Sequence, residues 1–236
     1  MSKPFHFKQF SIIQEQSAMK VGFDGVILGA WCDILEGNSY LDLGTGTGLI
    51  ALMLAQRNLQ ADITAIETDK KAIREAQFNF RQSAFNQRIN AVHADFIKWD
   101  STQQYHHVVS NPPFFTEKVA AGNVERTKAR QAENLPLCLW LKKAQELLLP
   151  GGKISFIYPA KEMPLITMTA EENELSLHRL CRVKSNPSKA PHRVLIELSK
   201  ETNLAPTISE LCIRQAHSND YHESFSNLCA PFYLGL

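Results

Sequence analysis

Residues 41–52 read LDLGTGTGLIAL, and the interpretation of the whole chain begins from this stretch. Residues 39–43 form an apolar run that predicts a buried strand, and Gly44, Gly46 and Gly48 follow it at once. The apolar run LIALMLAQR after the glycines is long enough for a helix. Glycines at such a turn let a ligand approach the backbone with no Cβ in the way. We therefore expect a nucleotide-like ligand at the first N–H groups of this helix.

Strands and helices alternate along the rest of the chain. Apolar patterns predict further strands over 61–67, 89–95, 105–111, 153–159, 175–185 and 192–200, and helices over 69–85 and 135–149. Strands that alternate with helices at this spacing indicate right-handed crossovers and a parallel sheet. The prediction is an α/β fold with a seven-stranded, mostly parallel sheet, helices on both faces and an antiparallel C-terminal hairpin.

Composition excludes several classes of protein. The 236 residues carry a net charge of +1, so a nucleic-acid partner needs a local basic patch. Five scattered cysteines without a C-x-x-C pattern are typical of reduced thiols in a cytoplasmic protein. No signal peptide and no membrane span are expected. His106 and His107 are adjacent in a strand and point to opposite faces, so we expect edge or surface histidines and no metal site.

Acidic residues stand at the ends of three consecutive predicted strands. Asp42, just before the glycines, would repel a pyrophosphate but suits a cationic ligand such as S-adenosyl-L-methionine. The same residue disfavours an NAD-dependent oxidoreductase, although residues 46–51 fit a dinucleotide-binding pattern. Glu67 is placed to bind ribose hydroxyls, and Asp95 to accept from an adenine amino group that Phe96 flanks. The alternative, a helix-capping Asp42 with two ordinary loop acids, explains this joint placement less well.

A rigid corner, SNPPFF at residues 110–115, ends the fourth strand. The Asn111 side-chain oxygen and the Pro112 carbonyl oxygen offer two acceptors whose directions the prolines fix. Two convergent acceptors match a planar –NH₂ group and return its lone pair to the nitrogen, ready to attack a methyl sulfonium. Phe114 offers a face on which a splayed-out base can stack.

These motifs resemble those of the class I, Rossmann-like methyltransferases that use S-adenosyl-L-methionine to modify amino groups. The N-terminal segment 7–32, with MKVGFDG at its centre, resembles the bacterial tRNA1(Val) adenine-N6 methyltransferases, which modify the adenosine 3′ of the anticodon. The C-terminal APHRVLIE and FYLGL fit the same family. The resemblance implies one domain over 1–236, in which 1–37 forms a lid over the cofactor or substrate and 38–236 forms the core.

The resemblance also implies a role for each site residue. The residues expected to bind S-adenosyl-L-methionine are Asp42, Gly44, Gly46, Gly48, Glu67, Asp95 and Phe96, with Lys20 and Asp24 closing over it or ordering the lid. Asn111 and Pro112 would hold the target amine, and Phe114 would stack on the base.

Two substrates other than a tRNA adenine stay open. Many adenine-N6 enzymes have Tyr where this chain has Phe114, and guanine-N2 enzymes of rRNA favour Phe. Protein glutamine-N5 methyltransferases use the same Asn-Pro-Pro corner but carry an N-terminal helical domain, whereas about forty residues precede the first motif here. A cofactor-binding RNA module without turnover is disfavoured by the intact Asn111 and glycines.

Binding of tRNA requires cations near the site. The residues expected to contact RNA are Phe115, Lys118, Arg126, Lys128, Arg130, Lys189 and Arg193. They lie in the irregular segment 114–134 and in the turn between the last two strands, where a folded tRNA would lie across them. None of these patterns defines the oligomeric state, and a monomer is favoured.

Overall fold

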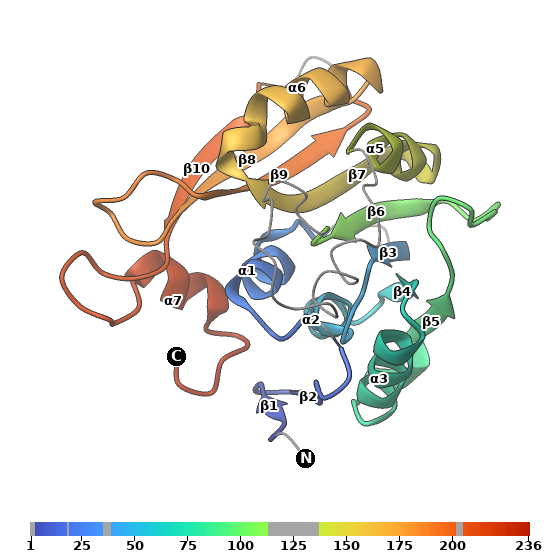
Figure 1. Ribbon diagram of the computed structural model, residues 1–236, viewed down its shortest axis with the longest axis horizontal. Helices are drawn as coiled ribbons and strands as arrows, with labels where there is room; N and C mark the ends of the chain where they lie inside the picture. The colour runs from blue at the N-terminus through green and yellow to red at the C-terminus, as the bar shows by residue number, and fades with distance from the viewer. Residues whose placement is uncertain (1–2, 18, 35–38, 113–136, 202–204) are drawn as a thin grey trace, which may run out of the picture.

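The computed structural model describes residues 3–17, 19–34, 39–112, 137–201 and 205–236. Within these ranges, eight strands form one sheet in the spatial order β10-β8-β9-β7-β6-β3-β4-β5 (Figure 1). These strands are β3 (Ser39–Leu43), β4 (Asp62–Glu67), β5 (Ile89–His93), β6 (Tyr105–Ser110), β7 (Leu148–Pro159), β8 (Ser176–Lys184), β9 (Arg193–Ser199) and β10 (Thr207–Cys212). The helices are α1 (Phe23–Trp31), α2 (Leu49–Arg57), α3 (Lys70–Arg81), α5 (Leu137–Glu146), α6 (Met163–Glu172) and α7 (Glu223–Cys229), with 3-10 turns η1 (Asn86–Arg88) and η2 (Ala160–Glu162).

The strand directions confirm the predicted α/β fold and correct its strand count. Within the described part of the eight-stranded sheet, only β9 runs antiparallel to its neighbours, β7 and β8, so the sheet is mostly parallel. The eighth strand, β10, pairs in parallel with β8 and forms the sheet edge, so the β8–β9 hairpin does not end the sheet as expected. Residues 207–210 are exposed, and β10 therefore lacks the apolar pattern by which the other strands were predicted.

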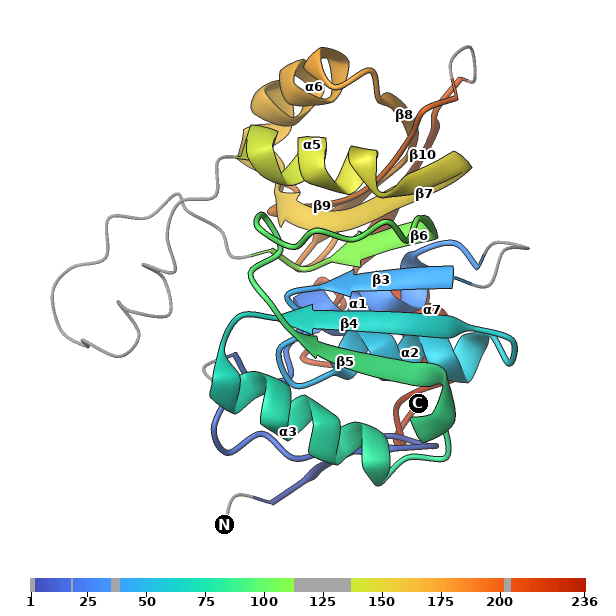
Figure 2. The same ribbon diagram turned by 90° about the vertical axis from the view of Figure 1, so that its right-hand side faces the viewer.

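Helices cover both faces of the sheet, and each face has its own apolar core. In Figure 2, α5 lies in front of the sheet and α1 and α2 lie behind it. One core cluster joins the sheet to α1, α2, α3 and α7, and the other joins it to α5 and α6. Alternate residues of β3 enter different clusters: Tyr40 faces the first, and Leu41 and Leu43 face the second. Asp42 thus points to the same side as Tyr40, towards α2.

Two predicted helices are shorter than expected. The predicted helix 135–149 is described from Leu137 and ends at Glu146, because Leu148 already pairs with Tyr105 of β6. β7 runs through Pro150-Gly151-Gly152, which the sequence suggested as a helix stop. A Cβ on Gly152 would lie 3.1 Å from the Tyr105 carbonyl oxygen, so this close strand approach requires glycine. The predicted helix 69–85 ends at Arg81, and Ala84 is exposed.

The expectation of edge or surface histidines is wrong for His107. Its side chain is fully buried, because β6 lies at the centre of the sheet with a core on each face. The ring Nε2 lies 2.8 Å from Ser155 Oγ, and burial lowers the pKa of His107 to about 4. His106, on the opposite face, is half-buried and lies 2.7 Å from Ser39 Oγ. His107 is therefore a neutral core residue.

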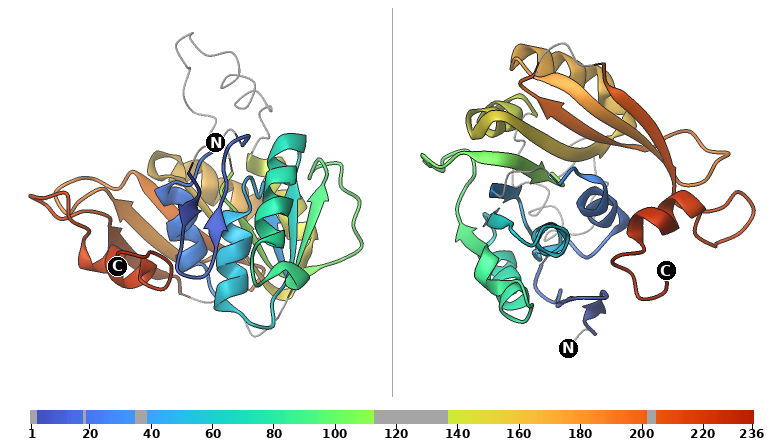
Figure 3. Two further views of the ribbon diagram at one scale, coloured as in Figure 1. Left: turned by 90° about the horizontal axis from the view of Figure 1, so that it is seen from below. Right: turned by 180° about the vertical axis from the view of Figure 1, so that it is seen from behind.

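The N-terminal strands β1 (Phe5–His6) and β2 (Ser11–Ile12) form a small antiparallel pair that the sequence patterns did not predict. This pair lies beside the segment that follows α7 (Figure 3). Phe7 and Tyr233 form an antiparallel bridge, and the Lys8 amide donates to the Phe232 carbonyl oxygen at 2.8 Å. The N-terminal residues are thus packed on the body of the protein.

A carboxylate on α3 holds the segment that follows β2. We call residues 13–17 the strap. Glu75 accepts hydrogen bonds from three successive strap amides, Glu15 at 2.5 Å, Gln16 at 3.0 Å and Ser17 at 2.9 Å. The Glu75 side chain is only 7% exposed, so these bonds provide the charge stabilisation that water would otherwise give.

One turn further along α3, Asn79 joins the strap to residues 44–48, which we call the glycine loop. Its Oδ1 accepts from the Ile13 amide, and its Nδ2 donates to the carbonyl oxygens of Ile13 and Thr47, all at 2.9 Å. Thr47 lies within the glycine loop. The strap and the loop are therefore positioned by the same helix.

We expect Glu75→Gln to loosen the strap. A glutamine replaces one carboxylate oxygen by an amino group, which would face a backbone N–H donor and remove at least one charge-assisted bond. The free energy of unfolding should fall by about 2 kcal/mol, and the amides of Glu15, Gln16 and Ser17 should exchange with deuterium faster. The control is Glu172→Gln, on an exposed acid of α6. Unchanged exchange in the strap would contradict this role of Glu75.

Candidate active site

The predicted site residues lie at one edge of the sheet because β3, β4, β5 and β6 are parallel and end together. Leu43 of β3 and Ser110 of β6 are register partners. The Ser110 hydroxyl also donates to the Leu43 carbonyl oxygen at 2.8 Å. Gly44 follows the first of these residues and Asn111 follows the second. The glycine loop and the Asn-Pro corner are thus neighbours on adjacent strands.

The three glycines of the loop have positive φ angles of 69°, 55° and 87° at Gly44, Gly46 and Gly48, which favour glycine. A Cβ on Gly44 would meet no atom within 4 Å, and one on Gly46 would meet only the Gly44 oxygen at 4.0 Å. These two positions therefore present bare backbone to open space. A Cβ on Gly48 would lie 2.3 Å from the Phe80 ring, so Gly48 lets α2 pack against α3.

Asp42 is fully buried beneath the glycine loop. Its Oδ2 accepts from the Thr45 hydroxyl at 2.6 Å and from the amide of Ala51, in the first turn of α2, at 3.1 Å. Its Oδ1 is buried and has no hydrogen-bond partner among the described residues. Burial raises the pKa of Asp42 to about 7; the two hydrogen bonds oppose the shift and the nearby Glu67 adds to it. Asp42 thus holds the first turn of α2 through one oxygen, and its other oxygen stays unpaired among the described residues.

Glu67, at the end of β4, also contacts the glycine loop. Its Oε2 accepts from the Gly46 amide at 3.0 Å, and its Oε1 accepts from the amides of Thr68 at 2.8 Å and Asp69 at 2.9 Å. These bonds fix the direction of the carboxylate at the mouth of the loop. Oε2 keeps acceptor capacity for a further donor, whereas two amides already occupy the acceptor sites of Oε1.

Asp95 and Phe96 follow β5 and differ in exposure. Asp95 is exposed, accepts from the Ile97 amide at 3.1 Å and forms an ion pair with Lys98 at 3.4 Å. Phe96 is 8% exposed and belongs to the apolar cluster on the α5–α6 face. Its ring therefore contributes mainly to the core in this structure, and Asp95 is the more accessible of the two.

Asn111 lies at the end of β6, half-buried, and Pro112 beside it is buried. The Asn111 Nδ2 lies 3.8 Å from the thioether sulfur of Met19. Its Oδ1 is buried and has no hydrogen-bond partner among the residues that the structure describes. Phe114 and Phe115 lie outside those residues, as do Lys118, Arg126, Lys128 and Arg130.

Lys20 and Asp24 make contacts that order the N-terminal segment. The Lys20 ammonium contacts the Gln14 carbonyl oxygen. The Asp24 carboxylate, in the first turn of α1, forms an ion pair with Arg193 at the start of β9, with 3.0 Å between Oδ2 and Nε. Arg193, expected to contact RNA, is therefore engaged by Asp24, whereas Lys189 is exposed.

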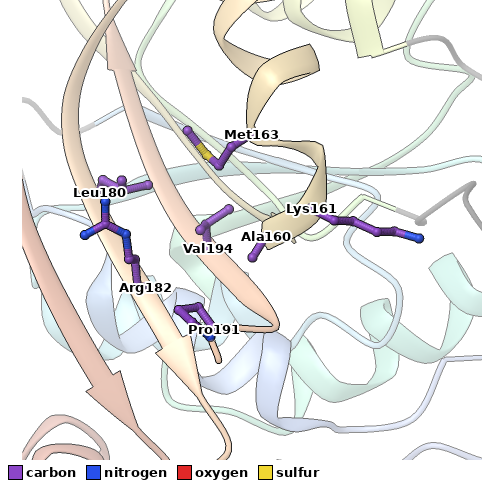
Figure 4. A pocket seen from close by; sticks show the side chains of 7 residues that line it. All are labelled: Ala160, Lys161, Met163, Leu180, Arg182, Pro191 and Val194. Carbon is purple, nitrogen blue, oxygen red and sulfur yellow. The ribbon is translucent and has the colours of Figure 1, made fainter. Parts of the chain in front are cut away.

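A hollow of about 480 Å³ lies beyond the end of β7, on the face that carries α6. Figure 4 shows Met163, Val194 and Ala160 around it, with the Lys161 side chain extending away. Its remaining lining residues are Leu180, Arg182 and Pro191. The hollow is thus lined by apolar side chains and by two exposed cationic residues, Lys161 and Arg182.

Several residues that shape this site were not predicted. Ser110, Thr45, Glu75 and Asn79 all bind the loop or its neighbours. For the last two the sequence held a signal, because a carboxylate and an amide four residues apart share one helix face with buried alanines. Among the described residues, no helix is long and apolar enough to cross a membrane, and no cluster of His, Cys, Asp and Glu is placed to hold a metal ion.

Comparison with known proteins places this site in a family. The Methyltransferase small domain family matches residues 31–164. The tRNA1(Val) (adenine(37)-N6)-methyltransferase of Vibrio vulnificus strain YJ016 is 40% identical over 99% of this chain and 96% of its own length.

Two solved structures share the fold. A predicted O-methyltransferase from Agrobacterium tumefaciens superposes with a TM-score of 0.70 at 18% identity, covering 89% of this chain and 96% of that one. The glycopeptide N-methyltransferase MtfA, complexed with S-adenosyl-L-methionine, superposes with a TM-score of 0.56 at 11% identity, covering 75% and 95% of the two chains. The chain belongs to the Methyltransferase small domain family and, within it, to the tRNA1(Val) (adenine(37)-N6)-methyltransferases.

Proposed function

We propose that this enzyme transfers a methyl group from S-adenosyl-L-methionine to N6 of adenine 37 in tRNA1(Val), the reaction named for its Vibrio vulnificus relative. The observation that carries the proposal is the buried Asn111 Oδ1, which has no partner among the described residues and lies beside the glycine loop. An unpaired buried acceptor is costly, and binding of an amine donor would satisfy it. Cytoplasmic location and a monomeric state are part of this proposal.

The residues around the glycine loop fit the cofactor. The bare backbone at Gly44 and Gly46 leaves room for a ligand against the start of α2. Asp42 Oδ1 is a buried, unpaired acceptor that suits the cationic amino-acid end. Glu67 would bind the ribose hydroxyls, and Asp95 the adenine amino group. S-adenosyl-L-methionine supplies an electrophilic methyl group on a positively charged sulfur.

At the neighbouring corner, Asn111 Oδ1 and the Pro112 carbonyl oxygen would accept the two hydrogens of the adenine amino group. Those bonds favour a lone pair localised on N6 and aim it towards the neighbouring glycine loop. The nucleotide has to leave its stack to reach this corner, and Phe114 would provide the stacking surface. No strong base is needed, because the proton leaves after methylation.

For tRNA, the structure adds cations to those predicted from the sequence. Lys161 and Arg182 flank the hollow beyond β7, and Lys189 lies in the turn between β8 and β9. We propose that they bind backbone phosphates, together with Lys118, Arg126, Lys128 and Arg130. Asp24 and Arg193 would act as a pair that fixes α1 against β9.

The proposed reaction is tested by supplying methyl-labelled cofactor with bulk tRNA, rRNA or a release factor in separate reactions. After digestion, the label should be found in N6-methyladenosine from tRNA. Label on N2-methylguanosine from rRNA, or on a glutamine side chain, would overturn the assignment of the substrate.

We expect Asn111→Ala to lower the single-turnover rate by about 10²–10³-fold, because the activating acceptor is lost. Cofactor affinity, measured by calorimetry, should stay within about twofold, because Asn111 is not placed among the cofactor ligands. The matched control is Asn173→Ala, on a half-buried asparagine at the end of α6. A near-normal rate would mean that the amine is held elsewhere.

Asp42 should make the stability of the ligand-free protein depend on pH. Between pH about 4 and about 7 the unfolded chain has an ionised Asp42 while the folded protein keeps the proton. The folded state then binds more protons, so the free energy of unfolding falls as pH rises through this window.

Asp42→Asn should remove that fall, because the amide does not titrate and can place its amino group at the unpaired position. Relative to this variant, the wild type should lose about 2 kcal/mol between about pH 5.5 and about pH 8 in denaturant titrations. Asp62→Asn, on an exposed acid of β4, is the control. Parallel pH profiles for wild type and Asp42→Asn would rule out the raised pKa.

A further inference from the structure

The N-terminal segment reaches the proposed catalytic corner through two residues. The Met19 sulfur lies 3.8 Å from Asn111 Nδ2. On the first turn of α1, a Cβ on Gly25 would lie 3.9 Å from the same nitrogen and 3.1 Å from Leu49. A Cβ on Gly25 would thus be tight only against Leu49, whereas its contact with the Asn111 amide would be an ordinary one. Met19 provides the polar contact that the amino end of this amide makes.

This contact distinguishes the two ends of the amide. The oxygen and nitrogen ends of an asparagine have almost the same shape, but only the nitrogen carries hydrogens. A thioether sulfur is an acceptor with no hydrogen to donate. Met19 therefore favours the orientation with Nδ2 towards the sulfur, which leaves Asn111 Oδ1 as the buried atom without a partner. The opposite orientation would present N–H groups to an amine that itself donates.

The backbone that carries Met19 is fixed although its side chain is 51% exposed. The Val21 amide donates to Gln14 Oε1 at 2.7 Å, and the Ser17 hydroxyl donates to the Met19 carbonyl oxygen at 3.1 Å. Ser17 also belongs to the strap, whose amides bind Glu75. A chain of contacts thus runs from α3 through the strap to the sulfur.

We propose that Met19 is a positioning residue for methyl transfer, which holds the Asn111 amide with its oxygen directed at the target amine. This inference rests on the proposed function. The sulfur does not touch the reacting atoms in this scheme. Its effect is to raise the fraction of enzyme in which the acceptor is correctly oriented before substrate binds.

The test compares single-turnover rates of tRNA methylation for variants at position 19. Met19→Leu keeps the apolar bulk but removes the acceptor, and the rate should fall about three- to tenfold. The KM for tRNA and the affinity for the cofactor should not change. Met19→Gln restores an acceptor on a side chain of similar length but also brings an –NH₂ donor that can bind the opposite orientation, so it should recover only part of the rate. Met168→Leu is the control, because Met168 on α6 is also 51% exposed.

Three results would overturn this inference. A Met19→Leu variant as fast as wild type would show that the sulfur has no orienting effect. Equal losses in Met19→Leu and Met168→Leu would indicate a general effect of losing a methionine. Equal losses in Met19→Leu and Met19→Gln would assign the effect to side-chain shape. A wild-type protein that methylates no tRNA would overturn the proposed function as well, whereas the first three results leave that function standing.

Discussion

The hydrogen bond from the Ser110 hydroxyl to the Leu43 carbonyl oxygen joins the two strand ends on which the site is built. Leu43 is followed by the glycine loop and Ser110 by Asn111, so the bond fixes the place where a methyl donor and an acceptor amine would meet. Main-chain pairing of β3 with β6 continues up to the same two residues. Because the bond is buried, water does not compete for it, and the spacing of the two corners is set by the sheet itself.

Most polar side chains at this edge have a structural task beside their proposed chemical one. Asp42 holds the first turn of α2, Glu67 holds the Gly46 amide, and Asn79 joins the loop to the strap. Each of these contacts fixes backbone that a ligand would touch. The unpaired atoms, Oδ1 of Asp42 and Oδ1 of Asn111, are the exceptions, and they lie where the two substrates are proposed to bind. Buried groups left without partners at such places are typical of functional sites.

Sequence patterns predicted those strands whose residue pattern is recognisable within the strand itself. The runs 39–43, 61–67 and 105–111 carry aliphatic, β-branched or aromatic residues and alternate with helices, so their strands and parallel direction could be inferred. The edge strand β10 has four exposed residues and leaves no such signal. The start of β7 was hidden because Pro150-Gly151-Gly152 has the composition of a helix stop but stands inside a strand.

Sequence patterns predicted the site residues that stand at strand ends, but they did not predict which distant residues these side chains contact. Asp42, Glu67 and Asn111 could be named because each stands at or near the end of a predicted strand. The partners of Asp24 and Glu75 could not, since Arg193 is 169 residues away and the strap 58 to 60. Such pairings depend on how the sheet brings distant segments together. His107 was assigned to the surface because a histidine in a central strand has the same local sequence as one at an edge.

The ion pair between Asp24 and Arg193 also bears on how the protein is made. The chain emerges from the ribosome with its N-terminus first, so α1 appears long before β9. Asp24 therefore has no ion-pair partner until Arg193 has been made, whereas β3, α2 and β4 can already associate. Incomplete chains that stop before residue 193 lack the pair.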